Sequence, residues 1–298
     1  MLTDPQKASY AENGYLVIES VLSKDAVAQC VEEIERFRSE AAGLAASNDR
    51  IDLEDSHTPD NPRIRRIKDP FENSPVFREI IRSEAILEPV RDLLGPDLRL
   101  HGSKLNMKSA AYGAPVEWHQ DWAFYPHTND SMLAVGVMLN DMQPENGPLL
   151  VLPGTQAGPV FDHTADGYFC GAMDLDACGL ADIQPARLTG PAGSISLHHV
   201  RVVHGSDLNR SSVDRKLLLF EISAADAFPI YGSTSSFESI EAYDARMLCG
   251  EPTAVPRLEP VPVRLPVPRR QAGSIYEFQS ATQNRSFSVY GAEANAVQ

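Results

Sequence analysis

The chain has few cysteines, fewer basic than acidic residues and no long apolar run. Its four cysteines are too few for a disulfide scaffold and form no CxxC pair of the kind that binds zinc, so we expect reduced thiols. No apolar stretch approaches the roughly 20 residues that a membrane-spanning helix needs, and the polar start MLTDPQKASY does not resemble an export signal. These absences predict a cytoplasmic protein with no membrane segment.

The formal net charge is -15, from 26 Lys and Arg against 41 Asp and Glu. Nucleic-acid phosphates require clustered Lys and Arg, so this balance argues against nucleic acid as a partner. It also disfavours a polyanionic substrate, although a local basic pocket would not be visible in a net charge. At 298 residues, 43% hydrophobic and 22% charged, the chain is typical of a globular protein. We expect such a protein to be a monomer or homodimer.

Helices are predicted mainly in the first third of the chain. Asp4-Pro5 is typical of a helix N-cap followed by proline, Asn13-Gly14 of a helix end, and residues 15–21 of an extended segment. From Ser23 onward apolar residues recur at helical spacing with charges between them, which predicts an amphipathic helix that backs a sheet. Residues 47–73 are polar and interrupted by proline, so we expect a loop with at most one short strand.

A further helical stretch is predicted from Ser74-Pro75 to near Gly95, and short strand-like runs separated by turn signals follow it. These runs are LRLHGSKLNMKSA, PVEWHQDWAF, MLAVGVML, PLLVLPG, GSISLHHVRVVHGS and RKLLLFEIS. Helices followed by many short strands predict a mainly β fold, a double-sheet barrel or jelly roll with flanking helices that form an N-terminal layer.

One domain is expected over residues 1–298, because no internal repeat or obvious linker divides a core at about residues 8–225. Residues 155–192 have little strand pattern and are long for a connection, so they are a candidate lid. Residues 226–298 are expected to pack on the core as a C-terminal extension. Six prolines within residues 251–268 favour extended chain, and the end SFSVYGAEANAVQ is expected to be a partly ordered tail.

His119 and Asp121 form the sharpest local pattern. Side chains alternate along a strand, so two ligands separated by one residue lie on the same face. Imidazole and carboxylate can hold one face of Fe(II) when a distant ligand completes a 2-His-1-carboxylate triad, and His204, between an apolar run and a turn, is the candidate. With eight His and 41 acidic residues, roughly one His-x-Asp/Glu is expected by chance, so the pair alone carries little weight.

Arg215 opens the strand-like run that follows His204. A guanidinium binds a carboxylate through two parallel hydrogen bonds, and a dicarboxylate that chelates iron at one end needs such a clamp at the other. Ser206, two positions after His204, can add a hydrogen bond to that distal carboxylate. The order of His204, Ser206 and Arg215 therefore indicates an iron site that also binds a dicarboxylate.

Four segments occur in order along the chain: YAENGYLVIESVLSKDAV, VEWHQDWAFYPH, PENGPLLVLPGTQAG and VVHGSDLNRSSVDRK. Together they resemble the phytanoyl-CoA dioxygenase (PhyH) family of Fe(II)/2-oxoglutarate-dependent oxygenases, including its ectoine hydroxylase-like branch, over most of residues 8–225. The resemblance implies a double-stranded β-helix (jelly roll or cupin-like). It also implies hydroxylation of a small metabolite with Fe(II), 2-oxoglutarate and dioxygen, succinate and CO2 as coproducts, and ascorbate as the reductant in vitro.

The resemblance assigns roles to individual residues. The implied iron ligands are His119, Asp121 and His204, and the implied 2-oxoglutarate contacts are Arg215, Ser206 and Asn106. Related halogenases replace the carboxylate ligand with a small residue, so Asp121 favours hydroxylation, desaturation or ring chemistry. Gly136 stands where some members carry a tryptophan that packs beside the cosubstrate, which implies different packing or a locally wider pocket.

The remaining histidines have a structural interpretation beside a functional one. His198 and His199 lie near His204 in the sequence, but we expect them to be structural or to support the metal ligands from outside. His101, His127 and His163 are expected to face solvent or to lie near the substrate rather than to bind metal.

Aromatic and basic residues around the metal motif are candidates for substrate contacts. Trp122, Phe124 and Tyr125 follow the motif directly, and such side chains pack in the core by default, so Trp122 and Tyr125 are candidates only. Lys104 and Lys108 are expected to be solvated, with Lys104 a candidate to neutralise an acidic substrate.

Three other functions remain open. A metal-dependent hydrolase or isomerase on the same barrel would leave Arg215 without a role. A catalytically inactive barrel that only binds a metabolite would not need all three ligands. An acyl-CoA 2-hydroxylase is disfavoured because no clear basic surface for the CoA phosphates is visible in the sequence.

Overall fold

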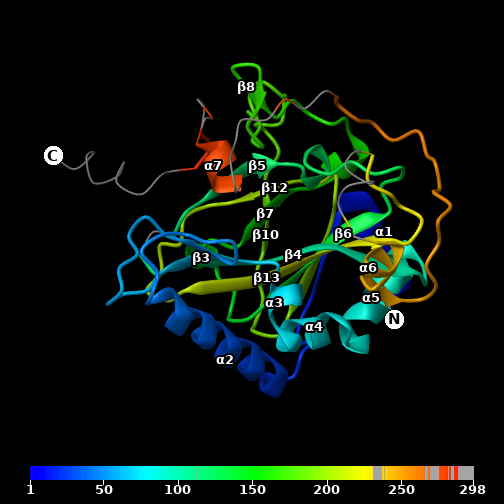
Figure 1. Ribbon diagram of the computed structural model, residues 1–298. Coiled ribbons are helices and arrows are strands. Elements are labelled where there is room, and N and C mark those ends of the chain that lie inside the picture. The colour runs from blue at the N-terminus through cyan, green and yellow to red at the C-terminus, as the bar shows by residue number, and fades with distance from the viewer. Residues whose placement is uncertain are drawn as a thin grey trace.

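Two antiparallel sheets face each other in the computed structural model (Figure 1). The structure describes residues 1–111, 113–230, 237, 239–265, 268, 275–280, 282 and 285–287. The larger sheet contains β1 (Tyr15–Ile18), β2 (Ile51–Leu53), β3 (Ile64–Lys68), β4 (Leu98–Lys108), β6 (Met132–Met138), β11 (Ile195–His199), β13 (Arg215–Ala224) and β14 (Met247–Cys249). The smaller sheet contains β5 (Val116–His119), β7 (Leu149–Leu152), β10 (Ala186–Leu188) and β12 (Val203–Ser206), and β8 (Thr164–Ala165) and β9 (Tyr168–Phe169) form a separate hairpin.

Several helices lie on the outer side of the larger sheet, whereas the last helix lies against the smaller sheet (Figure 1). The larger sheet has the order β1-β11-β6-β13-β4-β3-β2 with β14 beside β4, and the smaller has the order β10-β7-β12-β5. The helices are α1 (Asp4–Asn13), α2 (Lys24–Ala41), α3 (Pro70–Asn73), α4 (Pro75–Ile81), α5 (Glu84–Leu94), α6 (Ile240–Asp244) and α7 (Ile275–Gln279). Figure 1 shows α2, α3 and α4 below the larger sheet. The predicted mainly β fold, a double-stranded β-helix with an N-terminal helical layer, is confirmed.

The first helix begins one residue earlier than expected. Thr3, not Asp4, is the N-cap, and its hydroxyl accepts a hydrogen bond from the backbone N–H of Gln6 while the Gln6 side chain accepts one from the Thr3 N–H. This reciprocal capping box satisfies two N–H groups that the helix itself cannot pair. At the other end Gly14 adopts φ 77°, where glycine is least strained, so the predicted stop is correct.

The expected loop at residues 47–73 instead contains β2, β3 and α3. The signal was missed because the strands are polar: Arg66 Nη2 lies 2.7 Å from Asp52 Oδ2, and Lys68 Nζ lies 2.7 Å from Asp52 Oδ1. Charges paired across neighbouring strands stabilise a ladder without an apolar pattern. The single helical stretch predicted up to Gly95 is also divided, into α4 and α5.

Strand β13 separates an apolar from a polar environment. Leu218, Phe220 and Ile222 belong to the large hydrophobic core that the sheet forms with the helices. The alternate residues face the space between the sheets, among them the buried Arg215 and Glu221. A period of two along one strand therefore gives one face to packing and the other to chemistry.

Strand β4 follows the same rule. Leu105 and Met107 join the core with the helices, whereas Lys104, Asn106 and Lys108 face the other sheet. The prediction that Lys104 and Lys108 are solvated is wrong: Lys108 is 0% exposed and the Lys104 side chain is 26% exposed. Alternation on its own could not show which face of β4 is covered by the second sheet.

The chain after β13 runs as an extension over the core. Residues 251–265 form neither helix nor strand, as the prolines predict. The predicted tail lies outside the described residues from residue 288 onward. All four cysteines are free, and within the described part of the chain no helix is long and apolar enough to cross a membrane.

Buried histidines make the stability of the apoprotein depend on pH. Burial lowers the pKa of His101, His163 and His199 to about 4 and that of His127 to about 3. The unfolded chain takes up these protons near pH 6.5, so it binds more protons than the folded chain between about pH 6.5 and 4. Stability therefore falls as pH decreases through this window, by up to about 1.4 kcal/mol per pH unit for each group. We expect the urea midpoint to fall steadily from about pH 7 to 5, and a constant midpoint would contradict the burial of neutral imidazoles.

Candidate metal centre

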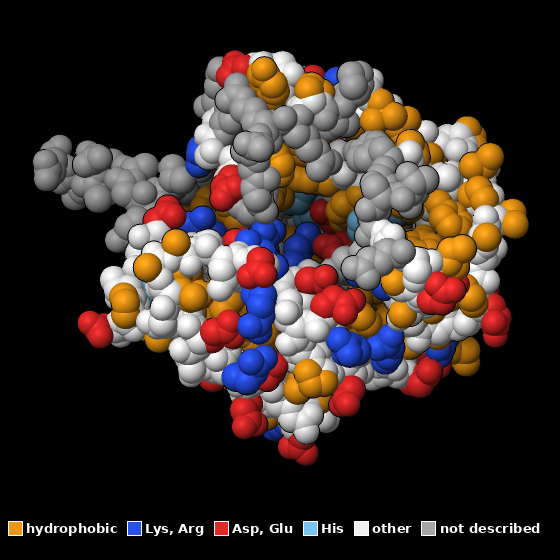
Figure 2. Space-filling view, in the orientation of Figure 1, with side chains coloured by type: hydrophobic (Ala, Val, Ile, Leu, Met, Phe, Trp, Pro, Cys, Tyr) orange, Lys and Arg blue, Asp and Glu red, His pale blue; other side chains and the backbone are white. Residues whose placement is uncertain are grey.

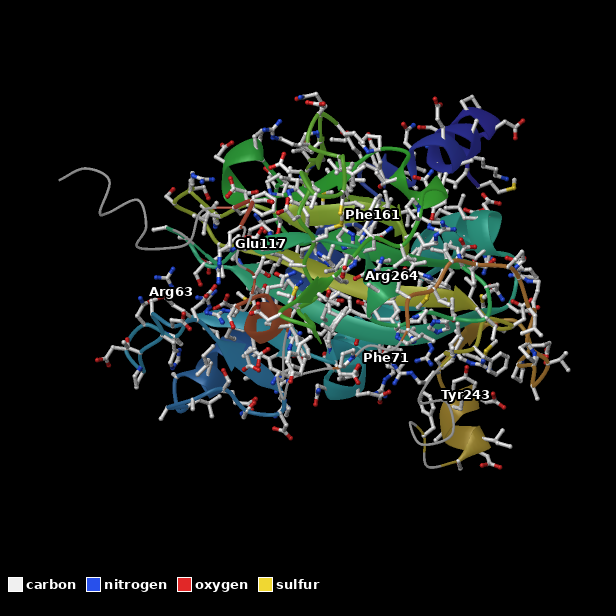
Figure 3. All side chains as sticks on the ribbon, turned by 90° about the horizontal axis from the view of Figure 1, so that it is seen from above. Arg63, Phe71, Glu117, Phe161, Tyr243 and Arg264 are labelled. Atoms are coloured by element: carbon white, nitrogen blue, oxygen red, sulfur yellow. The ribbon has the colours of Figure 1, made fainter. Side chains whose placement is uncertain are left out.

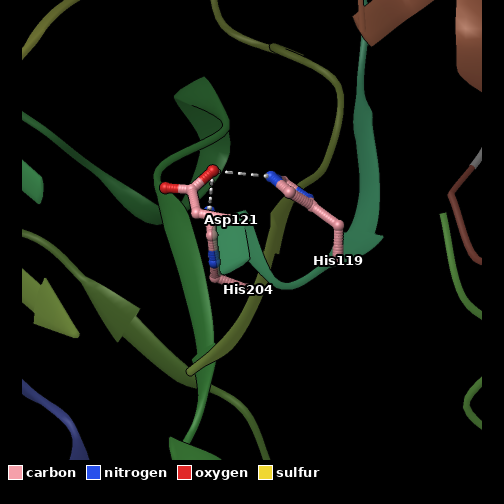
Figure 4. Close-up of side chains that lie close together, drawn as sticks. All are labelled: His119, Asp121 and His204. Carbon is pink, nitrogen blue, oxygen red and sulfur yellow. Dashed lines mark ion pairs between the residues drawn. The ribbon is translucent and has the colours of Figure 1, made fainter. Parts of the chain in front are cut away.

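Two histidines and one carboxylate converge between the sheets. His119 and His204 are register partners on the neighbouring strands β5 and β12, and Asp121 begins the turn η1 (Asp121–Ala123) just beyond β5. Nε2 of His119 lies 3.7 Å, and Nε2 of His204 3.9 Å, from Oδ1 of Asp121 (Figure 4). One ligand atom from each residue lies within 4.8 Å of the other two, a spacing that suits a 2-His-1-carboxylate metal site.

Gln120 keeps the side chains of His119 and Asp121 on the same side of the chain, although strand β5 ends at His119. Its backbone stays extended, with φ -113° and ψ 127°, so alternation continues for one more residue. On the opposite side its amide Nε2 donates to the carbonyls of Pro159 (3.1 Å) and Arg201 (2.8 Å), and its Oε1 accepts from the N–H of Phe161 (2.9 Å). The sequence offered no signal for this anchoring role.

Backbone carbonyls set the tautomer of both histidines. Nδ1 of His119 lies 2.8 Å from the carbonyl oxygen of Glu117, and Nδ1 of His204 lies 3.0 Å from that of Val202. Nδ1–H must donate in each pair, so the lone pair of Nε2 faces the centre. This is the arrangement in which a histidine that donates from one ring nitrogen binds metal through the other.

The protonation states suit a divalent metal as well. Burial lowers the pKa of His119 to about 4 and holds that of His204 well below its ordinary value. Burial alone would raise the pKa of Asp121, but the Lys104 ammonium and the neighbouring imidazoles keep it well below the usual range. At neutral pH the histidines are neutral and the carboxylate is ionised, so no proton has to leave before a metal binds.

His198 lies beside this group without joining it. Its Nε2 is 3.8 Å from Oδ2 of Asp121, the oxygen that the two histidine ligands do not face, and its ring centre lies 4.7 Å from that of His204. Its Nδ1 is buried without a hydrogen-bond partner among the described residues. This position agrees with the expected supporting role.

A cavity of about 250 Å³ adjoins the three donors. Figure 2 shows a hollow in this face of the molecule with Lys and Arg (blue) and His (pale blue) side chains visible inside it. Four residues that line the cavity have a buried polar atom without a hydrogen-bond partner among the described residues: Asn106 (Oδ1), Tyr125 (the hydroxyl), His198 (Nδ1) and Arg215 (Nε). An orphaned buried polar atom costs roughly 1–3 kcal/mol, so such a cluster indicates a place that a ligand completes.

Arg215 is the clearest of these orphans. Its side chain is 3% exposed, Nη1 donates to the carbonyl of Asn106 (3.2 Å), and no carboxylate of the described residues pairs with it. Burial lowers the pKa of Arg215 to about 10, which still leaves it charged at neutral pH. Ser206 lines the same cavity. The residues therefore fit a dicarboxylate with one end at Arg215 and Ser206 and the other at the metal.

The C-terminal extension contributes part of the cavity wall. Ile275 and Phe278 of α7 line the cavity. Gln279 holds α7 in place, because its amide donates to the carbonyl of Gly171 (2.8 Å) and accepts from the N–H of Glu117 (2.9 Å), a residue labelled in Figure 3. Among the residues that line this cavity, none of those the structure describes comes from the candidate lid at 155–192, whose closing role remains a prediction.

Gly136 does not leave a wider pocket. A Cβ at this position would lie 2.6 Å from Ser196 Oγ, 3.2 Å from Leu217 Cδ1 and 3.4 Å from Leu219 Cδ2. The two leucines belong to β13 and line the cavity. They occupy the space beside Gly136, so of the two expectations the structure supports different packing rather than extra room.

The predicted substrate residues divide into two groups. Lys104 and Tyr125 line the cavity. Trp122 does not: it is fully buried in a separate apolar cluster, and its indole N–H donates to the carbonyl of Pro262 (2.7 Å). Trp122 therefore packs in the core, which is the usual position of an aromatic residue.

The other histidines lie outside the donor group. His127 and His163 are 1% and 3% exposed, so of the two expected positions, facing solvent or near the substrate, the first does not apply to them. His163 Nε2 accepts the backbone N–H of Gln120 (2.9 Å), and His101 and His127 line a second cavity that shares Tyr125 with the first.

Comparisons with known proteins agree with this geometry. The family model described as phytanoyl-CoA dioxygenase (PhyH) matches residues 10–217. The chain is 37% identical over 287 residues to the probable alpha-ketoglutarate-dependent hypophosphite dioxygenase of Stutzerimonas stutzeri, covering 95% of this chain and 99% of that protein. It is 29% identical over 250 residues to the ectoine dioxygenase of Sphingopyxis alaskensis, covering 78% and 76%. The crystal structure of EctD from S. alaskensis with 2-oxoglutarate and 5-hydroxyectoine aligns with a TM-score of 0.66 at 26% identity, over 88% of each chain.

Removal of one imidazole tests the metal centre. We expect His204→Ala to weaken Mn(II) binding to the apoprotein more than about 100-fold, because loss of a direct ligand exceeds the 10–100-fold cost typical of outer partners. Isothermal titration calorimetry measures the affinity, and His199→Ala, a neighbouring histidine outside the donor group, is the control. Equal affinities of the two variants for Mn(II) would contradict the assignment.

Proposed function

Because the chain belongs to the phytanoyl-CoA dioxygenase family, we propose that it holds Fe(II) through His119, Asp121 and His204 and 2-oxoglutarate through Arg215. The protein is an Fe(II)- and 2-oxoglutarate-dependent dioxygenase that acts on a small molecule. The observation that carries the residue assignment is the buried guanidinium of Arg215, which has no carboxylate partner among the described residues and shares a cavity with the three metal donors. A hydrolase would have no use for that charge.

When bound, Fe(II) and 2-oxoglutarate supply the activation of dioxygen, and the cosubstrate is converted to succinate and CO2. The chain positions these groups and excludes water. His119 and His204 present unprotonated Nε2 atoms, Asp121 stays ionised, and Arg215 orients the far carboxylate of the cosubstrate. Phe278 of α7 covers part of the cavity and limits the access of solvent.

We infer that the substrate is a small oxyanion with a P–H bond, hypophosphite being the first candidate. Two further cations line the cavity, and their carboxylate partners are not among its lining residues. Lys104 Nζ lies 2.8 Å from Glu221 Oε1, and Arg66 Nη2 lies 2.7 Å from Asp52 Oδ2. Burial disfavours the ammonium of Lys104, but Glu221 and Asp121 raise its pKa above the ordinary value, so the charge persists. The relative that matches almost its whole length is named for hypophosphite.

The proposed reaction balances with the reactants of this enzyme class. One oxygen atom of dioxygen enters a P–H bond of hypophosphite and gives the P–OH group of phosphite. The other oxygen atom enters succinate while 2-oxoglutarate loses CO2. Dioxygen takes two electrons from phosphorus and two from the cosubstrate, so no further reductant is consumed in a productive cycle.

A zwitterionic metabolite is the second candidate. Lys104 at the cavity offers a cation for the carboxylate of such a substrate, and the ectoine dioxygenase of S. alaskensis is also a relative. Such a substrate would be hydroxylated at carbon rather than oxidised at phosphorus.

The net charge of -15 favours either small molecule over a partner rich in phosphate. We propose that the protein works as a monomer or homodimer in the cytoplasm, without nucleic acid or membrane.

Coupled turnover tests the function. With Fe(II), ascorbate and 2-oxoglutarate, we expect hypophosphite to raise succinate formation and to yield an equal amount of phosphite, measured by 31P NMR. His119→Ala should abolish both products. Succinate formation that responds to ectoine or L-proline but not to hypophosphite would favour the second candidate, and undiminished succinate in His119→Ala would contradict the metal assignment.

Lys104 is expected to affect the substrate more than the cosubstrate. Lys104→Met removes the ammonium but keeps a side chain of similar length. Loss of a charge-assisted hydrogen bond to the substrate should raise KM for hypophosphite about 10- to 100-fold. Lys216→Met, on β13 with its side chain only half-buried, is the control. A larger rise in KM for 2-oxoglutarate than for hypophosphite would place Lys104 at the cosubstrate instead.

A further inference from the structure

A second lysine of β4, Lys108, has an ammonium group that no substrate can reach. Its side chain is 0% exposed, and no carboxylate of the described residues forms an ion pair with it. Its Nζ instead donates to three backbone carbonyls, those of Ala114 (2.7 Å), Asp207 (2.7 Å) and Ser206 (3.4 Å). Burial and the neighbouring charge of Arg215 lower the pKa of Lys108, but the three carbonyls match the three N–H donors of an ammonium.

The three carbonyls belong to the segments that carry the metal ligands. Ala114 leads into β5, which ends in one histidine ligand, and Ser206 and Asp207 close β12, which carries the other. Lys108 itself belongs to the larger sheet, where it is the register partner of Arg215. One side chain therefore connects the proposed carboxylate clamp in one sheet with both ligand strands in the other.

The sheet ladder alone does not determine this arrangement. His204 pairs with His119, but Ser206 pairs with Val116, so the register between β12 and β5 shifts within two residues of β12. At such an irregularity part of the regular backbone pairing is missing. The contacts of Lys108 lie immediately after the shift and hold the end of β12 in place.

The residues around the Lys108 side chain are closely packed. Gly147 adopts φ 73°, and a Cβ there would lie 2.6 Å from the carbonyl oxygen of Asp207 and 3.0 Å from Cδ of Lys108. Asn209 supports the same region, because its Nδ2 donates to the carbonyls of Lys108 (2.9 Å) and Val213 (2.7 Å). The turn at Gly147 thus packs directly against the lysine stem.

We propose that Lys108 is a positioning residue that holds the end of β12, and with it Ser206, beside Arg215 so that both side chains reach the same carboxylate of 2-oxoglutarate. This inference rests on the proposed function. Lys108 does not touch the cosubstrate, since its donors are used by the backbone. It acts by joining the two sheets at the point where the cosubstrate must bridge them.

The test measures cosubstrate binding rather than turnover. Full-length Lys108→Met is loaded with Fe(II) under anaerobic conditions and titrated with 2-oxoglutarate, whose chelation of Fe(II) produces a visible absorbance band. We expect the dissociation constant for 2-oxoglutarate to rise at least about 10-fold, the lower end of the effect of outer-sphere partners, while Mn(II) affinity changes less than about threefold. Lys216→Met, next to Arg215 on β13, is the matched control.

A double-mutant cycle separates positioning from a general loss of stability. If Lys108 acts through Ser206, Lys108→Met should have a smaller effect on the dissociation constant in a Ser206→Ala background than in the wild type. Urea unfolding reports stability separately, and Lys108→Gln, which keeps an amide donor, replaces the methionine variant if that does not fold. An unchanged dissociation constant in a folded variant, or fully additive effects, overturns the inference. Failure of the wild type itself to form the absorbance band would instead contradict the proposed function, and this inference with it.

Discussion

The apolar layer between the larger sheet and its helices stabilises the polar interior on which the chemistry depends. Leu218, Phe220 and Ile222 of β13 belong to the same hydrophobic core as Ile34 and Phe37 of α2. Burying one such side chain contributes roughly 1.5–3 kcal/mol, and an orphaned polar atom costs roughly 1–3 kcal/mol. Each outward side chain can therefore offset about one orphan on the inner face of the same strands.

The inner face holds charges in place before their partners arrive. Arg215 remains charged in a buried position, and the proposed histidine ligands remain neutral. Burial shifts the pKa of each of these groups toward the neutral form but leaves that of the guanidinium far above neutral pH. A metal and a dicarboxylate thus find donors in the required protonation states. Little reorganisation is needed on binding, which is the main advantage of a rigid, preorganised site.

Part of the cavity wall lies within the segment that matches the family model, and part lies outside it. The family model covers residues 10–217, which include the three metal donors and Arg215. It ends before α7, although Ile275 and Phe278 line the cavity. The proposed metal and cosubstrate end of the cavity therefore belongs to the shared fold, whereas part of the wall comes from the C-terminal extension. We infer that this extension, together with Lys104, shapes the choice of substrate.

Local chemistry was visible in the sequence because it depends on short spacings. The His-x-Asp pair, the helix end at Gly14, and the succession of His204, Ser206 and Arg215 could all be identified from neighbouring residues and a period of two. The mainly β fold followed from the many short strand-like runs. The ion-paired strands β2 and β3 were missed, since their stability comes from charges paired across strands and not from an apolar pattern.

Burial and convergence were decided only by the tertiary structure. Lys104 and Lys108 resemble solvated lysines in the sequence, and only the second sheet makes one a cavity residue and the other a link between strands. The role of α7 likewise depends on a contact between Gln279 and Glu117, residues 162 positions apart. The sequence by itself determined the donors and their order. Which charges are sealed from water, and what covers the cavity, depended on long-range contacts that no local pattern records.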